Sequence, residues 1–313
     1  MKNVVFDGHS DLLTDVVIRR TKGERHVLER VHLERLRQGG IEGLILSLWA
    51  NPNVGEQYGE KTRELMVFAK EEFAESPWLA VVCNTKEAQK ARAKGKRYVF
   101  LAVEGMAAIG ADPEGVDAYA DFGIRMGMLT WNETNLLATG AKGDPYSGLT
   151  AAGKRVIRQM QERDMIVDVS HLNCGGFWDV IRMTQGPVIA SHSNSRRLCD
   201  VPRNLTDEQL RAIRDTGGVV GVNAYHGFVH GSPEKQTVQM LARHAAHMAE
   251  VMGVEYVACG FDFCEFLGPG NEAVAGMETC AHVQSFFDWL EKFGMSEAER
   301  RMIARENLLR VLQ

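Results

Sequence analysis

Eight short segments rich in apolar and β-branched residues recur along the 313-residue chain, and stretches with a helical pattern separate them. This order predicts parallel βαβ units. Because the segments are almost continuously apolar, we expect both faces of the sheet to be covered. No linker rich in proline, glycine or serine divides the chain, so a single α/β domain over residues 1–313, a (β/α)8 TIM barrel, is favoured. The predicted strands cover residues 3–9, 41–50, 97–105, 123–132, 165–171, 187–193, 218–225 and 255–263.

Helical patterns are clearest in five stretches between and after these segments, and two of them carry a capping box. Thr206 with Gln209 begins one such helix, and Ser296 with Glu299 begins another. The five predicted helices cover residues 60–75, 149–164, 205–218, 233–253 and 296–312.

Charge and hydropathy exclude several classes of partner. The net charge is -5 and there is no run of Lys or Arg, so we expect neither nucleic acid nor a membrane surface as a partner. The apolar run near the N-terminus is shorter than a signal-peptide core, and no stretch approaches a membrane span. We therefore expect a cytoplasmic protein. Its six cysteines are scattered without paired zinc-finger spacing, so they should be reduced.

Side chains that bind metal ions follow five of the predicted strands, at the end of the barrel where chemistry is found. Behind them the residues on the same face are apolar, as Val167 and Val169 are behind the polar end of the fifth strand. Carboxylates and imidazoles just above an apolar stack are costly unless they are paired or bind metal. The side chains are His9 and Asp11, Glu104, His171, His192 and Asp262.

This set of side chains predicts two zinc ions per chain. Imidazole and carboxylate suit Zn²⁺, but a single catalytic zinc normally uses only three protein ligands. Two ions that share one carboxylate account for five ligands, and Glu104 lies in the middle of the set, so it is the expected bridge. Such ions, roughly 3.5–4 Å apart, can hold a hydroxide between them and polarise a carbonyl.

Other histidines need no metal to explain them. A lone histidine at a strand end is usually structural, and only the convergence of five strand ends favours a metal site. His244 and His247 are three residues apart on a predicted helix, so we expect packing or surface roles. His226 and His230 follow the seventh strand and remain candidates for the pocket mouth.

The chain resembles the membrane (renal) dipeptidase family, a branch of the amidohydrolase superfamily. The matching pieces keep the family's order and span nearly the whole chain: DGHSDLL, VEG, LTWNETN, VDVSH, IASHSNSR, PRNLTDEQL, GFDF and ENLLRVL. The resemblance implies a (β/α)8 barrel with a binuclear zinc site and, at the family level, a homodimer. It implies that His9, Asp11 and Glu104 hold one ion, and that Glu104, His171 and His192 hold the other.

Two further roles come from the resemblance alone. Arg203 matches the arginine that binds the C-terminal carboxylate of a dipeptide, and a guanidinium can pair with a carboxylate bidentately. The alternative for Arg203 is a capping or ion-pairing role near the following helix. Asp262 matches the family's aspartate that moves a proton from the attacking water to the leaving amine.

The chain departs from the family pattern at two places. Animal members carry a histidine that is thought to contact the substrate or the developing oxyanion, where this chain has Trp131 followed by Asn132. Indole is only a donor, so the ions, Asn132 or Asn135 would have to replace that histidine. The family often has Asp-Phe-Asp after the eighth strand, whereas Cys264 takes the place of the second aspartate here.

The implied function is zinc-dependent hydrolysis of small dipeptides, including L-D dipeptides, by the bridging hydroxide. The partner is therefore a small-molecule substrate. Two alternatives remain open. An amidohydrolase of N-acyl amino acids, dehydropeptides or lactams would also use Arg203. A tailoring enzyme or a non-hydrolytic binding relative is the second alternative, which loss of metal ligands would favour, and none of them is lost.

Overall fold

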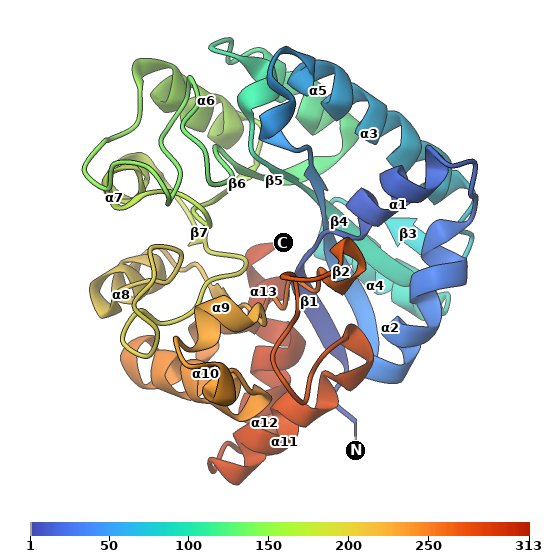
Figure 1. The fold of residues 1–313 in the computed structure, drawn as a ribbon, viewed down its shortest axis with the longest axis vertical. Coiled ribbons are helices and arrows are strands. Elements are labelled where there is room, and N and C mark those ends of the chain that lie inside the picture. Colours follow the sequence, from blue (N-terminus) through green and yellow to red (C-terminus); the bar gives the residue numbers. More distant parts are fainter. Residues whose placement is uncertain (1) are drawn as a thin grey trace.

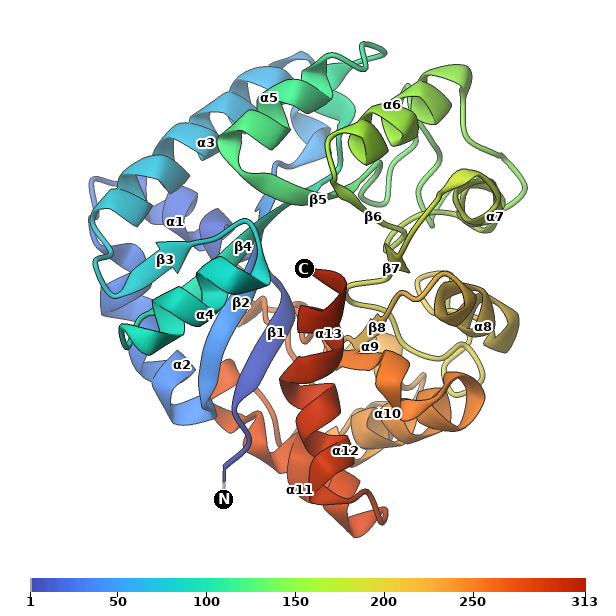
Figure 2. The same ribbon diagram turned by 180° about the vertical axis from the view of Figure 1, so that it is seen from behind.

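A ring of parallel strands surrounded by helices forms the body of the protein, in a computed structural model that describes residues 2–313 (Figures 1 and 2). The main sheet runs β1-β2-β4-β5-β6-β7, with β3 paired to β4, and β8 and β9 form a second parallel pair. A bridge between Ala190 and Val220 joins the two sheets, and the Asp262 amide donates to the His9 carbonyl beyond β9. The predicted barrel is confirmed. The strands are β1 (Val5–Ser10), β2 (Ile41–Trp49), β3 (Leu79–Val81), β4 (Arg97–Glu104), β5 (Ile124–Met128), β6 (Ile166–Asp168), β7 (Val188–Ile189), β8 (Val220–Val222) and β9 (Val257–Cys259).

The helices include all five predicted stretches and several that the sequence pattern missed. Both capping boxes form, at Thr206 and at Ser296. The last predicted helix is interrupted by a π-helical turn, Met302–Glu306. The helices are α1 (Leu12–Arg20), α2 (Leu33–Gly39), α3 (Tyr58–Ala74), α4 (Thr85–Ala93), α5 (Gly115–Phe122), α6 (Ala151–Glu162), α7 (Cys174–Met183), α8 (Asp207–Asp215), α9 (His226–Val229), α10 (Val238–Met252), α11 (Gln284–Lys292), α12 (Glu297–Arg301) and α13 (Asn307–Val311).

Strands β6 to β9 are shorter than predicted, so the alternation rule does not reach the polar residues that follow them. At β6 the strand ends at Asp168, whose Oδ1 accepts hydrogen bonds from the amides of Ser170 and Ser191. A side chain thus takes the place of a ladder partner. Beyond these strands His171 and Asp262 have φ of 67° and 59°, in the left-handed region. Their side chains are therefore aimed by turns and not by strand pleating.

The apolar core has two layers. One lies between the strands and the surrounding helices, and the other fills the inside of the ring. The inner layer includes Phe6 and Phe100 from the strands and Leu308 and Leu312 from the C-terminal end of the chain. The helix α13 lies in the middle of the ring in both views (Figures 1 and 2). The chain's own end therefore fills one mouth of the barrel, which leaves the mouth at the carboxyl ends of the strands for chemistry.

Backbone packs directly on backbone where β8 and β9 meet the segment after β7. A Cβ atom on Gly221 would lie 2.0 Å from the carbonyl oxygen of Ser191, and one on Gly260 would lie 1.7 Å from the same oxygen. Only glycine fits at these two positions. This close approach fixes the carbonyl of the residue that directly precedes His192.

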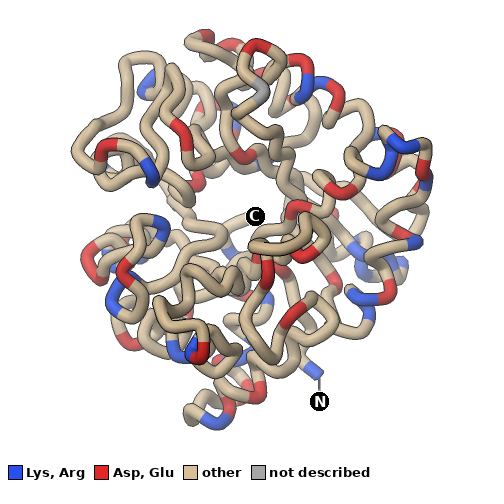
Figure 3. The backbone as a smooth tube through the Cα atoms, in the orientation of Figure 1, with Lys and Arg blue, Asp and Glu red and all other residues tan. Residues whose placement is uncertain are grey.

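The outer surface carries charges of both signs, interspersed around the ring (Figure 3). Within residues 2–313, no helix combines the length and the apolar character needed to cross a membrane.

Candidate metal centre

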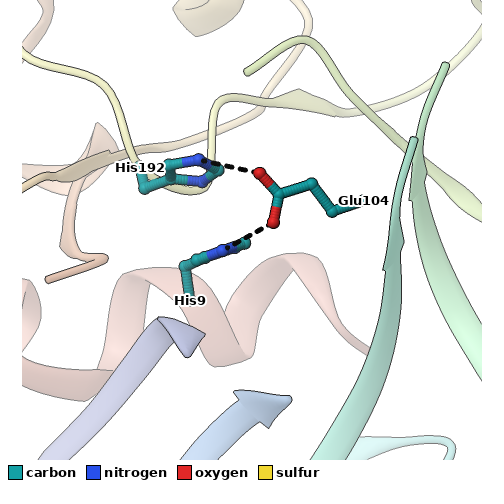
Figure 4. A group of neighbouring side chains, drawn as sticks. All are labelled: His9, Glu104 and His192. Carbon is teal, nitrogen blue, oxygen red and sulfur yellow. Dashed lines mark ion pairs between the residues drawn. The ribbon is translucent and has the colours of Figure 1, made fainter. Parts of the chain in front are cut away.

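The carboxylate of Glu104, at the end of β4, lies between three histidines. Its Oε2 is 3.2 Å from His9 Nε2, while its Oε1 is 2.8 Å from His171 Nε2 and 3.9 Å from His192 Nε2. Figure 4 shows one oxygen of the carboxylate directed at the His9 ring and the other at the His192 ring. All four side chains are buried. Residues from four different strand ends thus meet at the barrel mouth, with Glu104 at the centre, as the sequence predicted.

Asp11 and Asp262 lie on the His9 side of this carboxylate. His9 Nε2 is 3.6 Å from Asp11 Oδ1 and 3.8 Å from Asp262 Oδ1. Ligand atoms of His9, Asp11 and Asp262 fall within 4.8 Å of one another, and so do those of His9, Glu104 and His192. The six predicted side chains therefore form one cluster. Asp262, for which a proton-transfer role is predicted, is close enough to His9 and Asp11 to share a metal ion with them.

Several polar atoms in the cluster have no hydrogen-bond partner among the described residues. Each of these atoms is itself buried, and an unpaired buried polar atom is costly. In addition, the Nε2 atoms of His171 and His192 are 2.9 Å apart, and both face the Glu104 carboxylate. A cluster of imidazole nitrogens and carboxylate oxygens is a suitable donor set for Zn²⁺ and similar ions. The residues therefore fit a metal site. The unpartnered atoms are His9 Nδ1 and Nε2, Asp11 Oδ1 and Glu104 Oε2.

Hydrogen bonds on the far side of two imidazoles orient them toward Glu104. His171 Nδ1 is 3.0 Å from Asn132 Oδ1, an acceptor, so the proton lies on Nδ1 and leaves the Nε2 lone pair free. The Nδ1 of His192 is 2.8 Å from Ser191 Oγ. Asn132 lines the cavity with its carbonyl oxygen already engaged, and its predicted role at the oxyanion stays a prediction. Asn135 is not among the residues that line the cavity, and its side chain bonds within its own loop, which disfavours it as the substitute.

Asp262 is held by a neutral partner on each oxygen. Its Oδ2 accepts a hydrogen bond from Asn223 Nδ2 at 2.9 Å, and its Oδ1 is 3.4 Å from Cys264 Sγ. That sulfur is also 3.6 Å from Asp11 Oδ2. Burial, and then the charge of Asp262, raise the pKa of Cys264 well above its usual value, so the thiol keeps its proton. Cys264, the second departure from the family pattern, therefore contacts both Asp11, a predicted metal ligand, and Asp262, the predicted proton carrier.

A cavity of about 470 Å³ opens above the cluster, and Arg203 reaches into its wall. The guanidinium donates to Ser193 Oγ at 3.3 Å and to the His192 carbonyl at 3.1 Å, while its Nε has no partner. Within the described part of the chain it pairs with no carboxylate, so the ion-pair alternative is not supported. Burial lowers the pKa of Arg203 to about 10, and the group stays charged near neutral pH.

Two tryptophans form an aromatic wall of the same cavity. The ring of Trp131 packs edge to face against Trp49 at 5.5 Å between centroids, and it lies 6.1 Å from the His171 ring. Trp131 therefore lines the cavity, and its contact with a substrate stays a prediction. Its position makes it a shape-defining surface next to a predicted ligand.

Burial shifts the proton affinities of the cluster in the metal-free state. Burial, reinforced by the charge of Asp11, raises the pKa of Glu104 to about 8, and burial likewise raises the pKa of Asp262. Burial and neighbouring cations hold the pKa of His171 and of His192 well below the usual value. The carboxylates of Glu104 and Asp262 resist ionisation, and the imidazoles of His171 and His192 resist protonation, so a divalent cation would relieve the first cost without being opposed by the second. His9 differs, because its burial is outweighed by the charges of Glu104 and Asp11, which raise its pKa well above the usual value, so a cation would have to displace its proton.

The chelated protein is expected to lose thermal stability as the pH rises from about 6.5 to about 9. The folded-state pKa of Glu104 lies above its value in the unfolded chain, so stability is lost as pH rises through about 8. The depressed pKa values of His171 and His192 act only below about 6.5 and do not oppose this trend. Scanning calorimetry with and without a chelator tests this, and metal should stabilise most at the high end. A chelated Tm that climbs over the range would contradict the metal-site interpretation.

The remaining histidines named in the sequence have structural partners. His244 is fully buried and bonds the Ser195 amide and the Val229 carbonyl, while His247 pairs with Asp207. Their predicted packing or surface roles are confirmed. His226 bonds Gln236 and lies outside the cavity lining, as does His230.

Sequence reasoning missed several cavity residues, three of which lie on loops or on the short helix α9. Lys142 lies on the long segment between β5 and α6, and Tyr225 and Phe228 follow β8. These segments carry no periodic pattern, so only the Gly- and Pro-rich composition around Lys142 marked a loop at all.

The sequence of the chain is similar to those of known proteins. The model of the membrane dipeptidase family, peptidase family M19, matches residues 1–313. A protein of the pqqA 5′ region of Klebsiella pneumoniae is 41% identical over 165 residues, which cover 49% of this chain and 61% of that protein.

Two solved structures are similar over nearly their whole lengths. One, described as dipeptidase AC, a metallopeptidase of family M19, is 25% identical with a TM-score of 0.89 and covers 100% of this chain and 98% of its own. The other, a metallopeptidase from Rhodobacter sphaeroides bound to a phosphinate mimic of L-Ala-D-Ala, is 24% identical with a TM-score of 0.89 and covers 100% and 99%. The latter supports the fold.

Proposed function

The chain belongs to the membrane dipeptidase family, peptidase family M19, and so is by family a metallo-dipeptidase; on this premise we propose that it hydrolyses small dipeptides with two Zn²⁺ ions. In this proposal His9, Asp11 and Glu104 hold one ion, and Glu104, His171 and His192 hold the other. When bound, the ions would activate water and polarise the scissile carbonyl.

One observation carries this proposal: the two oxygens of Glu104 face different histidines, His9 on one side and His171 on the other, at 3.2 and 2.8 Å. A simple ion pair between Glu104 and one charged histidine would not explain why a second histidine faces the other oxygen. The arrangement matches what a bridging ligand requires, and it lies at the floor of a cavity large enough for a small molecule.

The chain's own residues supply substrate binding and proton transfer. Arg203 is a buried cation without a carboxylate partner, so the C-terminal carboxylate of a dipeptide would complete its hydrogen bonding. Asp262, held by Asn223, accepts a proton from the attacking water and returns it to the departing amine. Trp131 and Trp49 restrict the cavity beside His171. Together these groups select a short substrate with a free C-terminus.

The test is a panel of L-L and L-D dipeptides, assayed with a chelator and after Zn²⁺ is restored. Matched N-acyl amino acids and C-terminally amidated dipeptides belong in the panel. We expect hydrolysis of free dipeptides, its loss on chelation, its return with zinc, and about two ions per chain by metal analysis. Faster cleavage of N-acyl amino acids would favour the broader amidohydrolase alternative. Two bound ions without any cleavage would favour a non-hydrolytic relative.

A further inference from the structure

A second cavity of about 410 Å³ adjoins the one above the metal centre. Three residues line both cavities: Lys142, His171 and Arg203. The other walls of the second cavity come from the loop before α6, the start of α7 and the segment between β7 and α8. A substrate that is held at the boundary can therefore extend into either space.

The second cavity is lined by cations and, among the described lining residues, by no Asp or Glu. Arg203 is buried without an acidic partner, and Lys142 makes no ion pair within residues 2–313. The Nζ of Lys142 lies 5.8 Å from the centre of the Trp131 ring. Arg196 is partly neutralised, because its Nε bonds Asp200 at 2.7 Å. Charge is thus uncompensated mainly at the boundary that the two cavities share.

The neutral polar residues of this cavity are already committed to the scaffold. Asn173 donates to two backbone carbonyls and caps α7, and Asn204 donates to the carbonyls of Cys199 and Phe228. Gln209 completes the capping box of α8. These amides therefore have little hydrogen-bonding capacity left for a ligand. The available recognition chemistry is positive charge.

We propose that this second cavity receives an acidic side chain on the C-terminal residue of the dipeptide, and that Lys142 pairs with it. The inference rests on the proposed function, because it takes Arg203 as the group that binds the C-terminal carboxylate. Arg203 lies on the boundary, so the side chain of the same substrate residue starts beside it. The second cavity then offers space, and Lys142 offers the free cation.

The experiment compares two pairs of dipeptides that differ only in charge: Ala-Glu against Ala-Gln, and Glu-Ala against Gln-Ala. The readout is the ratio of kcat/KM within each pair, for the zinc-loaded wild type, Lys142→Met and Lys142→Arg. Lys86→Met, on α4 and outside both cavity linings, is the matched control because it makes the same change in net charge.

The wild type should prefer Ala-Glu over Ala-Gln by about two- to fivefold, as one ion pair to an exposed lysine allows. The preference should fall to about unity in Lys142→Met, persist in Lys142→Arg and in the control, and weaken with added salt. If Ala-Gln is cleaved and the wild type shows no preference, the inference fails while the dipeptidase function stands. A preference for Glu-Ala over Gln-Ala, or one that survives in Lys142→Met, also overturns it. If the loaded protein cleaves none of the four, the proposed function itself fails.

Discussion

Glu104→Gln is expected to lower kcat/KM for dipeptides on the order of 10³-fold or more, while the barrel still folds. The substitution keeps the size of the side chain but removes the charge that faces His9 and His171. Without that charge the two proposed ions would lose their common ligand. Metal content, measured by elemental analysis, should fall together with activity.

Stability separates this result from simple unfolding. In the metal-free wild type, burial raises the pKa of Glu104 to about 8, so its ionised form costs folding energy at higher pH. Glutamine removes that cost, so chelated Glu104→Gln should melt no lower than the chelated wild type at about pH 8.5. Glu42→Gln is the matched control, since Glu42 lies near the start of β2, at the other end of the barrel.

His9→Ala and Asp11→Ala extend the same test. Each should remove one ion and abolish hydrolysis, because His9 Nε2 lies within 4 Å of both Glu104 and Asp11. Full activity in either variant, or in Glu104→Gln, would reject the ligand assignment.

The second large effect is expected at Arg203. Arg203→Met should lower kcat/KM for dipeptides with a free C-terminus by about 10²- to 10³-fold, in line with the loss of a buried charge-assisted contact. The arginine is 6% exposed and has no acidic partner of its own, so the substrate carboxylate is its natural counter-ion.

An amidated substrate isolates that contact. The wild type should cleave a C-terminally amidated dipeptide poorly, and Arg203→Met should treat the free and the amidated forms about equally. Met248→Leu, in the buried face of α10, serves as a control for a neutral core change. A wild type that cleaves the amide as fast as the free dipeptide would remove the carboxylate clamp from the mechanism.

Strand identity was readable from the sequence, but strand length was not. The apolar segments between helical stretches located all eight strands of the ring, because a strand that is buried on both faces is almost continuously apolar. The same pattern continued past Asp168, where a side chain takes over the backbone hydrogen bonds and the strand ends. Local side-chain capping leaves no periodic signal, so the ends of β6 to β9 could not be placed.

The sequence predicted the candidate site residues at strand ends, but it did not predict the contacts that loop residues make with them. Glu104 is the last residue of β4, and His9 lies within β1, so the topology alone brings them together. The bond from His171 to Asn132 joins residues 39 positions apart, and the contact of Cys264 with Asp11 spans 253. Such pairings depend on how long loops fold back over the barrel mouth, which no short pattern encodes.

The left-handed backbone at His171 and Asp262 has a consequence for how this protein can change. A side chain in that conformation costs roughly 1–3 kcal/mol, which glycine would not incur. Selection for thermal stability alone would therefore favour glycine at both positions and remove two groups of the proposed metal site. A library sorted only for heat resistance should therefore accumulate glycine at these two turns and lose the proposed activity.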